Sequence, residues 1–505
     1  MIYYPDSARY DTCGAPVVII IAGGKGSQGI VPAYPAYLTN YGFIEVFFNF
    51  PGGGSGVLQS GGAYDLRGPA CITALKDVIK FCCGQIENNA HKFLNEIIPV
   101  TPNYNDVGLV GGSNGGNIAL AVTGMYGDSL PGLKWIVNWE SPVGDGNILA
   151  DMGVVNMGGG NPTCNKAYND TTGNFDYTKL RYTDTLYFGY GQGLDTVAGF
   201  YFDNNNDDIP GDTLDFSLEP LIYGSGLDKR AYYSKKIIEL GYSMGLIPAI
   251  HPYYIPSDSE ATEFWKWRDG GNWIDTIGTK RPDLLFMVTA KNHNHYISAP
   301  DAPGVLFQYN AFLNTSLPVV RLNPDSTYLR YVLDTINAPG LSDNECFTVY
   351  DHLSIRNAME PDSIDEIILY SAGACELADR SIRGDYRIQL DSVYDNCIPY
   401  VADTISDTTS DTTYVSKLIF RNEEATIFPN PSSASFTLSF ESMLSENIFI
   451  EMSDVTGRKI FSEGKKSVAG KNNFTFSNQD FENGTYLIAL RRNGGTQYLK
   501  LEVLH

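Results

Sequence analysis

Continuous apolar runs alternate with helix-like segments in the first part of the chain. Residues 15–22 and 43–50 are mostly β-branched or aromatic, as expected of strands buried on both faces. Residues 70–81 carry apolar side chains at helical spacing, and residues 107–112 form another apolar run. This alternation predicts a doubly wound, mostly parallel α/β sheet with glycine loops at the carboxyl ends of its strands.

The pattern changes near residue 400. Residues 401–423 include a low-complexity Thr/Ser/Asp run with few apolar residues, typical of a linker. Short segments of alternating polarity follow, and turn residues separate them, as in a small β-sandwich. These segments are residues 435–440, 448–452, 473–476, 486–490 and 498–503. We therefore expect an α/β domain over residues 1–400 and an all-β sandwich over residues 424–505.

A long insertion interrupts the α/β pattern over about residues 143–275. It is too long for a simple connection between strands and predicts a cap over the functional site. Its last part, residues 263–268, is expected to be a helix that returns to the sheet and buries its tryptophans in the core.

One acidic segment of the insertion has the spacing of a calcium loop. Asp203, Asn205 and Asp207 occupy alternate positions, and Asp212 could supply a further oxygen. The glutamate usual at the twelfth position is missing, because Leu214 stands there. We expect either a structural calcium site or a solvated acidic turn, and we expect no cofactor to be required for function.

Charge and composition argue against several kinds of binding partner for this chain. The chain has 505 residues and a net charge of −23, which argues against nucleic acid or an anionic membrane as a partner. Eight cysteines show no zinc-ligand spacing. No segment is long and apolar enough to span a membrane.

The most informative motif is a serine between two glycines. The segment Gly111-Gly112-Ser113-Asn114-Gly115 follows the apolar run at 107–112 and opens a helix-compatible stretch. This is the strand–turn–helix context of a GxSxG nucleophile elbow, in which glycines permit the tight backbone crossing that exposes the serine. A glycine-rich turn with an incidental serine is the alternative.

Residues from about 1 to 379 resemble the α/β-hydrolases, in particular secreted esterases and dienelactone-hydrolase-like proteins. The matching segments are the loop after Ile21, residues 49–52, residues 61–68 and the elbow. The resemblance implies that Ser113 is the nucleophile. It also implies that the backbone N–H groups of Asn114 and of Gly24, or of a neighbour of Gly24, stabilise the oxyanion.

The resemblance also implies a histidine base and a carboxylate, in the chain order serine, acid, histidine. His352 follows the expected last strand, residues 318–322, and is the preferred base, although it could be a surface histidine; His295 is the alternative. Asp301 is the preferred acid. Aligning on His295 puts Asn294 where the acid is expected, and an amide cannot stabilise an imidazolium as a carboxylate does. Asp325 and Glu140 are therefore further candidates.

The last 80 or so residues resemble the C-terminal sorting domain of the type IX secretion system. The matching motifs are residues 428–431, 454–459 and 483–486. The resemblance implies a type IX secretion partner and export through the periplasm to the outer surface or the medium. Such export requires a signal peptide that the sequence does not show, so we expect a longer natural N-terminus.

These features predict a secreted serine hydrolase that cleaves small-molecule or polymer-linked carboxylic esters. A serine peptidase is less favoured because no propeller-like gating domain precedes the fold. A catalytically inactive hydrolase fold that binds ligands at the surface is the other alternative.

Overall fold

The computed structural model describes most of the chain. The described ranges are residues 1–24, 36–144, 151–154, 163–169, 172–184, 199–210, 214–225, 228–248, 254–291, 303–335, 366–387, 390, 393–394, 425–442, 447–454, 459–468, 470–479, 481, 483–492 and 495–504. The chain divides into two compact units, Met1–Asp407 and Thr408–His505. Each unit is considered by itself below.

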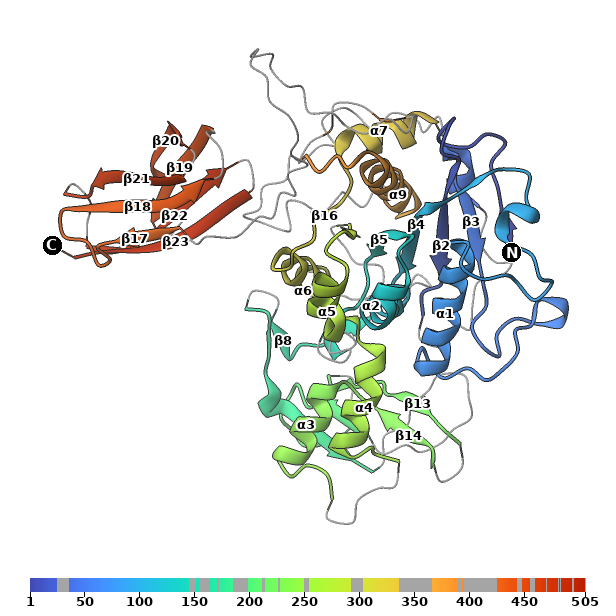
Figure 1. Ribbon diagram of the computed structural model, residues 1–505. Helices are drawn as coiled ribbons and strands as arrows, with labels where there is room; N and C mark the ends of the chain where they lie inside the picture. Colours follow the sequence, from blue (N-terminus) through green and yellow to red (C-terminus); the bar gives the residue numbers. More distant parts are fainter. Residues whose placement is uncertain are drawn as a thin grey trace. The chain divides into compact units, whose positions relative to one another are not determined.

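The first unit is built on a seven-stranded sheet (Figure 1). In spatial order its strands are β1 (Ile2–Tyr3), β3 (Ile44–Phe47), β2 (Ala15–Ile21), β4 (Pro102–Gly112), β5 (Leu133–Trp139), β15 (Leu285–Thr289) and β16 (Val319–Leu322). All neighbouring strands are parallel except β1, which is antiparallel to β3. The predicted mostly parallel α/β sheet is confirmed.

Both faces of the sheet are buried under helices, which explains why its strands are continuously apolar. Val17, Ile19 and Ile21 of β2 join the core on one face, whereas Val18 joins the core on the other. The first face packs against α1 (Pro69–Cys82), α2 (Asn114–Tyr126), α5 (Ile274–Lys280) and α6 (Pro303–Leu313). The second packs against α7 (Ser326–Thr335) and α9 (Glu366–Arg383).

The insertion between β5 and α5 has a hydrophobic core of its own. Its strands are β6 (Gly153–Val154), β7 (Thr163–Cys164), β8 (Tyr168–Asn169), β9 (Asn174–Phe175), β10 (Leu180–Thr183), β11 (Gly199–Phe202), β12 (Phe216–Ser217), β13 (Leu221–Tyr223) and β14 (Arg230–Tyr232), and its helices are α3 (Lys235–Ser243) and α4 (Asp258–Arg268). The helix predicted at 263–268 is the second half of α4. Trp265 is buried as expected, whereas Trp267 is only partly buried.

The second unit is a pair of antiparallel sheets. One contains β17 (Thr426–Phe428), β18 (Ser435–Ser442) and β21 (Gly470–Ser477); the other contains β20 (Lys459–Lys466), β19 (Asn447–Asp454), β22 (Gly484–Arg492) and β23 (Gly495–Val503). Phe436 and Leu438 of β18 share one core with Ile448 and Ile450 of β19. This core between two sheets is that of a small β-sandwich. The five predicted strands are present, whereas β17 and β20 were not predicted.

Across the described ranges, no helix combines the length and the apolar character needed to cross a membrane.

Candidate active site

Ser113 lies at the junction between β4 and α2. Its backbone has φ 48° and ψ −124°, a conformation that non-glycine residues rarely adopt. Its N–H donates to the carbonyl of Trp139 on the neighbouring strand at 2.8 Å, and the residue is partly exposed. The strand, turn and helix predicted around Ser113 are therefore present, and the turn is strained at the serine.

The glycines around Ser113 are required for close packing. A Cβ atom on Gly111 would lie 2.7 Å from the backbone of Gly116, and a Cβ on Gly115 would lie 2.5 Å from the carbonyl oxygen of Ile21. A Cβ on Gly116 would overlap Ser141 Oγ. None of these three glycines has a positive φ. Their role is to let β4, α2 and the end of β2 approach one another.

The loop after β2 lies against the serine. A Cβ atom on Gly23 would stand 3.1 Å from Ser113 Cβ and 3.1 Å from the carbonyl oxygen of Gly112. Gly24 follows with φ 73°. Asn114, on the other side of Ser113, is the first residue of α2, so its N–H has no acceptor within the helix. The two predicted oxyanion donors therefore belong to segments that flank the serine.

Arg67 is a component of this region that the sequence reasoning missed. Its side chain is buried, and its Nη2 donates to the carbonyl oxygens of Ala22, Gly23 and Gly24 at 2.8, 3.3 and 3.4 Å. Its Nε donates to Tyr64 Oη at 3.1 Å. Burial lowers the pKa of the Arg67 guanidinium, which nevertheless stays charged at neutral pH. The only signal in the sequence was its place within the matching stretch 61–68.

Glu140 is the candidate acid that lies level with Ser113 on a neighbouring strand. Gly112 of β4 pairs with Trp139 of β5, and Glu140 follows Trp139 with φ 42°. The Glu140 side chain is buried. Its Oε1 accepts the Lys291 N–H at 3.1 Å, at the start of the segment that contains His293 and His295.

Asp325 has a different role in the described contacts. Its Oδ1 accepts the Thr327 N–H at 2.9 Å, in the first turn of α7, and its Oδ2 accepts the Leu390 N–H at 3.3 Å. Asp325 follows β16, and both β5 and β15 separate β16 from the elbow strand. Asp325 therefore caps a helix and fixes a loop, whereas Glu140 is the better placed of the two carboxylates.

Several predicted site residues lie outside the described ranges: His352, His295, Asn294, Asp301 and Asp212. Their roles stay predictions. His91 is the histidine that the structure describes; its side chain is 90% exposed, and its Nδ1 lies 3.4 Å from a Glu87 carboxylate oxygen. His91 is therefore a surface residue.

The predicted calcium loop follows β11. The Asp203 carboxylate accepts the N–H groups of Asp207 and Asp208, each at 3.2 Å, and lies 3.9 Å from Arg181 Nη2. Asn205 Nδ2 donates to Asp207 Oδ2 at 2.8 Å. Within the described part of the chain, no three His, Cys, Asp or Glu side chains form a metal cluster. In this arrangement, Asp203 faces amide hydrogens and a guanidinium, which does not fit a calcium cage. Calcium binding stays a prediction that titration can test.

A cavity of about 650 Å³ separates the residue 64–66 segment from the β13–β14 hairpin of the insertion. Its lining residues are Tyr64, Leu66, Ile222, Tyr223, Gly224, Ser225, Asp228, Arg230, Tyr232 and Glu260. Three tyrosines and three charged side chains make this wall both aromatic and polar. Tyr64 also accepts a hydrogen bond from Arg67. The Arg67 side chain therefore connects the cavity wall to the loop beside Ser113.

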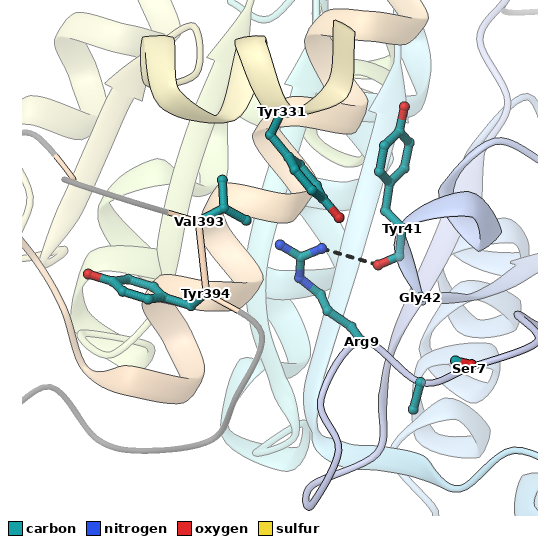
Figure 2. Close-up of a pocket in the computed structure, with 8 residues that line it drawn as sticks. Ser7, Arg9, Tyr41, Gly42, Tyr331, Val393 and Tyr394 are labelled. Carbon is teal, nitrogen blue, oxygen red and sulfur yellow. Dashed lines mark hydrogen bonds between the residues drawn. The ribbon is translucent and has the colours of Figure 1, made fainter. Parts of the chain in front are cut away.

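A second cavity, of about 340 Å³, surrounds Arg9 (Figure 2). Arg9 Nη1 donates to the Tyr41 carbonyl at 3.1 Å, and its Nε and Nη2 donate to the buried Asp379 carboxylate at 2.6 and 2.7 Å. Tyr41 and Gly42 precede β3, so this cavity lies at the amino-terminal edge of the sheet. Open α/β sheets bind ligands at the carboxyl edge, where Ser113 lies. We therefore assign the Arg9 cluster a structural role rather than a role in ligand binding.

Asp106 belongs to the amino-terminal half of β4. Its side chain is fully buried, and its Oδ1 accepts the Trp135 indole N–H at 3.0 Å. Burial raises the pKa of the Asp106 carboxyl to about 8. At neutral pH this group is therefore mostly protonated in the folded protein.

Comparison with known proteins identifies the tail. Residues 426–503 match the family described as "Secretion system C-terminal sorting domain". This confirms the resemblance predicted from the three tail motifs. The protein is exported by the type IX system and is secreted or held at the cell surface.

The other comparisons were made with the whole chain. No curated protein sequence matches the chain. The latent dimeric PorU of Porphyromonas gingivalis matches at 24% identity and a TM-score of 0.14, covering 16% of this chain and 9% of PorU. A β-glucosidase of Listeria innocua matches at 11% identity, both with glucose (TM-score 0.12, 47% of this chain, 33% of the enzyme) and without it (TM-score 0.13, 46% and 32%). The chain thus spans a third or less of these proteins, and such low similarity carries no functional argument.

Proposed function

We propose that this exported protein is a serine hydrolase that cleaves carboxylic esters through an acyl-enzyme on Ser113. The observation that carries the proposal is the strained backbone of Ser113, with φ 48° and ψ −124°, at a strand–helix junction against the Gly23–Gly24 loop. Residues held in such conformations are concentrated at functional sites, because the surrounding structure must offset the strain.

In this proposal Ser113 Oγ attacks the ester carbonyl carbon as a base removes the hydroxyl proton. The carbonyl oxygen becomes an oxyanion, and the N–H groups of Asn114 and of the Gly24 region donate to it. Collapse of the tetrahedral intermediate expels the alcohol, which takes the proton from the base. Water then attacks the acyl-enzyme by the same route and releases the acid.

The base in the proposal is His352, with His295 as the alternative, and Asp301 remains the acid predicted from the sequence. Among the described carboxylates, Glu140 is favoured over Asp325. Glu140 is level with Ser113 on the adjacent strand, whereas the Asp325 oxygens accept N–H groups at a helix start. Glu140, like Ser113, also has a positive φ, as expected where function requires a strained position.

The 650 Å³ cavity supports a substrate with a polar or ring-bearing group away from the scissile bond. Pockets of this size hold drug-sized ligands, and a few polar groups on the wall set their orientation. We assign this cavity to the part of the ester that determines specificity, on the strength of its link to the serine loop through Tyr64 and Arg67.

The test is labelling with a fluorophosphonate probe, comparing the parent protein with Ser113→Ala. The expected result is covalent labelling of the parent that the substitution abolishes. Ser141→Ala is the matched control, because Ser141 Oγ is buried beside the elbow and contacts the Gly111 carbonyl. A folded parent that resists labelling, with and without the insertion opened by mild proteolysis, would favour the inactive surface-binding alternative.

A further inference from the structure

The short segment before α1 has an unusual backbone. Leu66 and Arg67 are consecutive non-glycine residues with φ of 54° and 66°, a combination that costs free energy at each position. Surrounding groups hold this conformation. Arg268 of α4 donates to the carbonyls of Leu66 and Asp65 at 2.8 and 2.5 Å, and the Asp65 carboxylate accepts the Gly68 N–H at 3.0 Å.

The strained segment directs the Arg67 side chain to the backbone of the loop after β2. Its Nη2 contacts three successive carbonyls, those of Ala22, Gly23 and Gly24. In a trans peptide the C=O and the following N–H point in opposite directions. Because the Ala22 and Gly23 carbonyls face Arg67, the N–H groups of Gly23 and Gly24 are directed away from it.

Those two N–H groups belong to the loop that lies next to Ser113. A Cβ atom added to Gly23 would lie only 3.1 Å from Ser113 Cβ, so the loop is within reach of the oxyanion of a tetrahedral intermediate formed on Ser113. The guanidinium also polarises the carbonyls it contacts, and polarisation along a hydrogen-bonded chain strengthens the donor at the other end. The buried cation therefore both orients these amides and makes them better donors to an oxyanion.

We propose that Arg67 is a positioning residue that holds the Gly23–Gly24 loop in the conformation that stabilises the oxyanion. The inference rests on the proposed function and adds a role that neither the elbow motif nor the triad includes. Arg67 acts on the transition state through the loop amides and does not touch the substrate.

The test compares Arg67→Lys with Arg281→Lys in the full-length protein. Lysine keeps the charge but lacks the planar fork with which Arg67 donates to the loop carbonyls through Nη2 and to Tyr64 Oη through Nε at the same time. Arg281 is the matched control, since it is also a buried arginine that donates to backbone carbonyls, those of Leu130 and Leu133, away from the serine. The measurements are the fluorophosphonate labelling rate, kcat and KM for p-nitrophenyl acetate, and thermal unfolding.

We expect Arg67→Lys to slow labelling and lower kcat by about 10²-fold, the usual effect of losing one oxyanion donor. KM should stay within about threefold, because an interaction made only in the transition state does not alter ground-state binding. Arg281→Lys should lower the Tm without this loss of kcat. Parent-like labelling by a folded Arg67→Lys protein would overturn the proposal, as would equal losses in both variants.

Tyr64→Phe keeps the experiment decisive if Arg67→Lys does not fold. It removes only the hydroxyl that accepts from Arg67 Nε, and we expect a several-fold slower labelling. Parent-like kinetics in Tyr64→Phe would then overturn the inference. Failure of the parent itself to label would instead refute the proposed function, so the two failures are distinguishable.

Discussion

Gly115→Ala tests whether close packing at the elbow sets the geometry of the candidate site. The new Cβ atom would lie 2.5 Å from the Ile21 carbonyl oxygen and 2.9 Å from that of Ala22. Ordinary carbon–oxygen contacts are no shorter than about 3.3 Å. The start of α2 and the end of β2 must therefore move apart by about 0.8 Å. Both obstacles are backbone atoms, and no side chain can rotate away to make room.

The displacement should affect chemistry more than stability. A misplacement of about 1 Å can cost about 10²-fold in rate, and we expect fluorophosphonate labelling to slow by about that factor. Overpacking costs about 1–3 kcal/mol, while replacing glycine by alanine within a helix recovers up to about 1 kcal/mol. The expected net loss of unfolding free energy is therefore about 0–3 kcal/mol.

The assay is the second-order labelling rate, measured beside urea unfolding of the same preparation. Gly61→Ala is the control, because its Cβ would meet nothing within 4 Å and Gly61 does not have a positive φ. It should label at the parent rate. If folded Gly115→Ala also labels at the parent rate, the packing argument for the elbow is wrong.

The remaining predictions concern the candidate acid, the buried Asp106 carboxyl and the C-terminal domain. Glu140→Gln should slow labelling at least about tenfold at pH 7, whereas Asp325→Asn should label normally and lose about 1 kcal/mol in urea unfolding through the weakened α7 cap; the opposite pattern would make Asp325 the acid. The Asp106 carboxyl has its pKa raised from 3.8 in the unfolded chain to about 8 in the folded protein, so the folded state holds the extra proton and the unfolding free energy should fall as pH rises between these values. The slope is about 1.4 kcal/mol per pH unit for one proton, and Asp106→Asn should flatten the dependence of urea midpoints between pH 5 and 8; identical slopes would contradict the assignment. Deleting residues 426–505 should retain the protein on the periplasmic side of the outer membrane with Ser113 still reactive, as measured by cell fractionation and labelling. Normal export of the truncated chain would contradict the role of the C-terminal domain.

The sheet was predictable because each of its central strands is buried on both faces. Residues 15–22 and 107–112 are therefore continuously apolar, and the glycines that follow them mark the carboxyl edge. Helix α9 was not predicted. Its buried Glu376, Asp379 and Arg380 interrupt the apolar pattern, and only the ion pairs of the folded state, such as Arg9 with Asp379, explain them.

The candidate site was predictable only where its parts are contiguous in sequence. Ser113 and Asn114 are recognisable because their neighbours are glycines. Arg67 depends on contacts with residues more than 40 positions away, and Glu140 depends on the register between β4 and β5. No local pattern encodes either relationship, so tertiary structure was needed to identify Arg67 and to favour Glu140, already a candidate from the sequence, over Asp325.

The packing of the elbow has an evolutionary consequence. Gly111, Gly115 and Gly116 are constrained by neighbouring backbone and by Ser141, whether or not Ser113 reacts. A descendant that abandoned chemistry would still be under selection to keep these glycines, because losing one would disturb the junction of β2, β4 and α2. These glycines therefore report the fold, whereas Ser113 and Glu140 would be free to change once the proposed activity is no longer selected. Among homologues that keep these three glycines, conservation of Ser113 and Glu140 would therefore distinguish active enzymes from inactive ones.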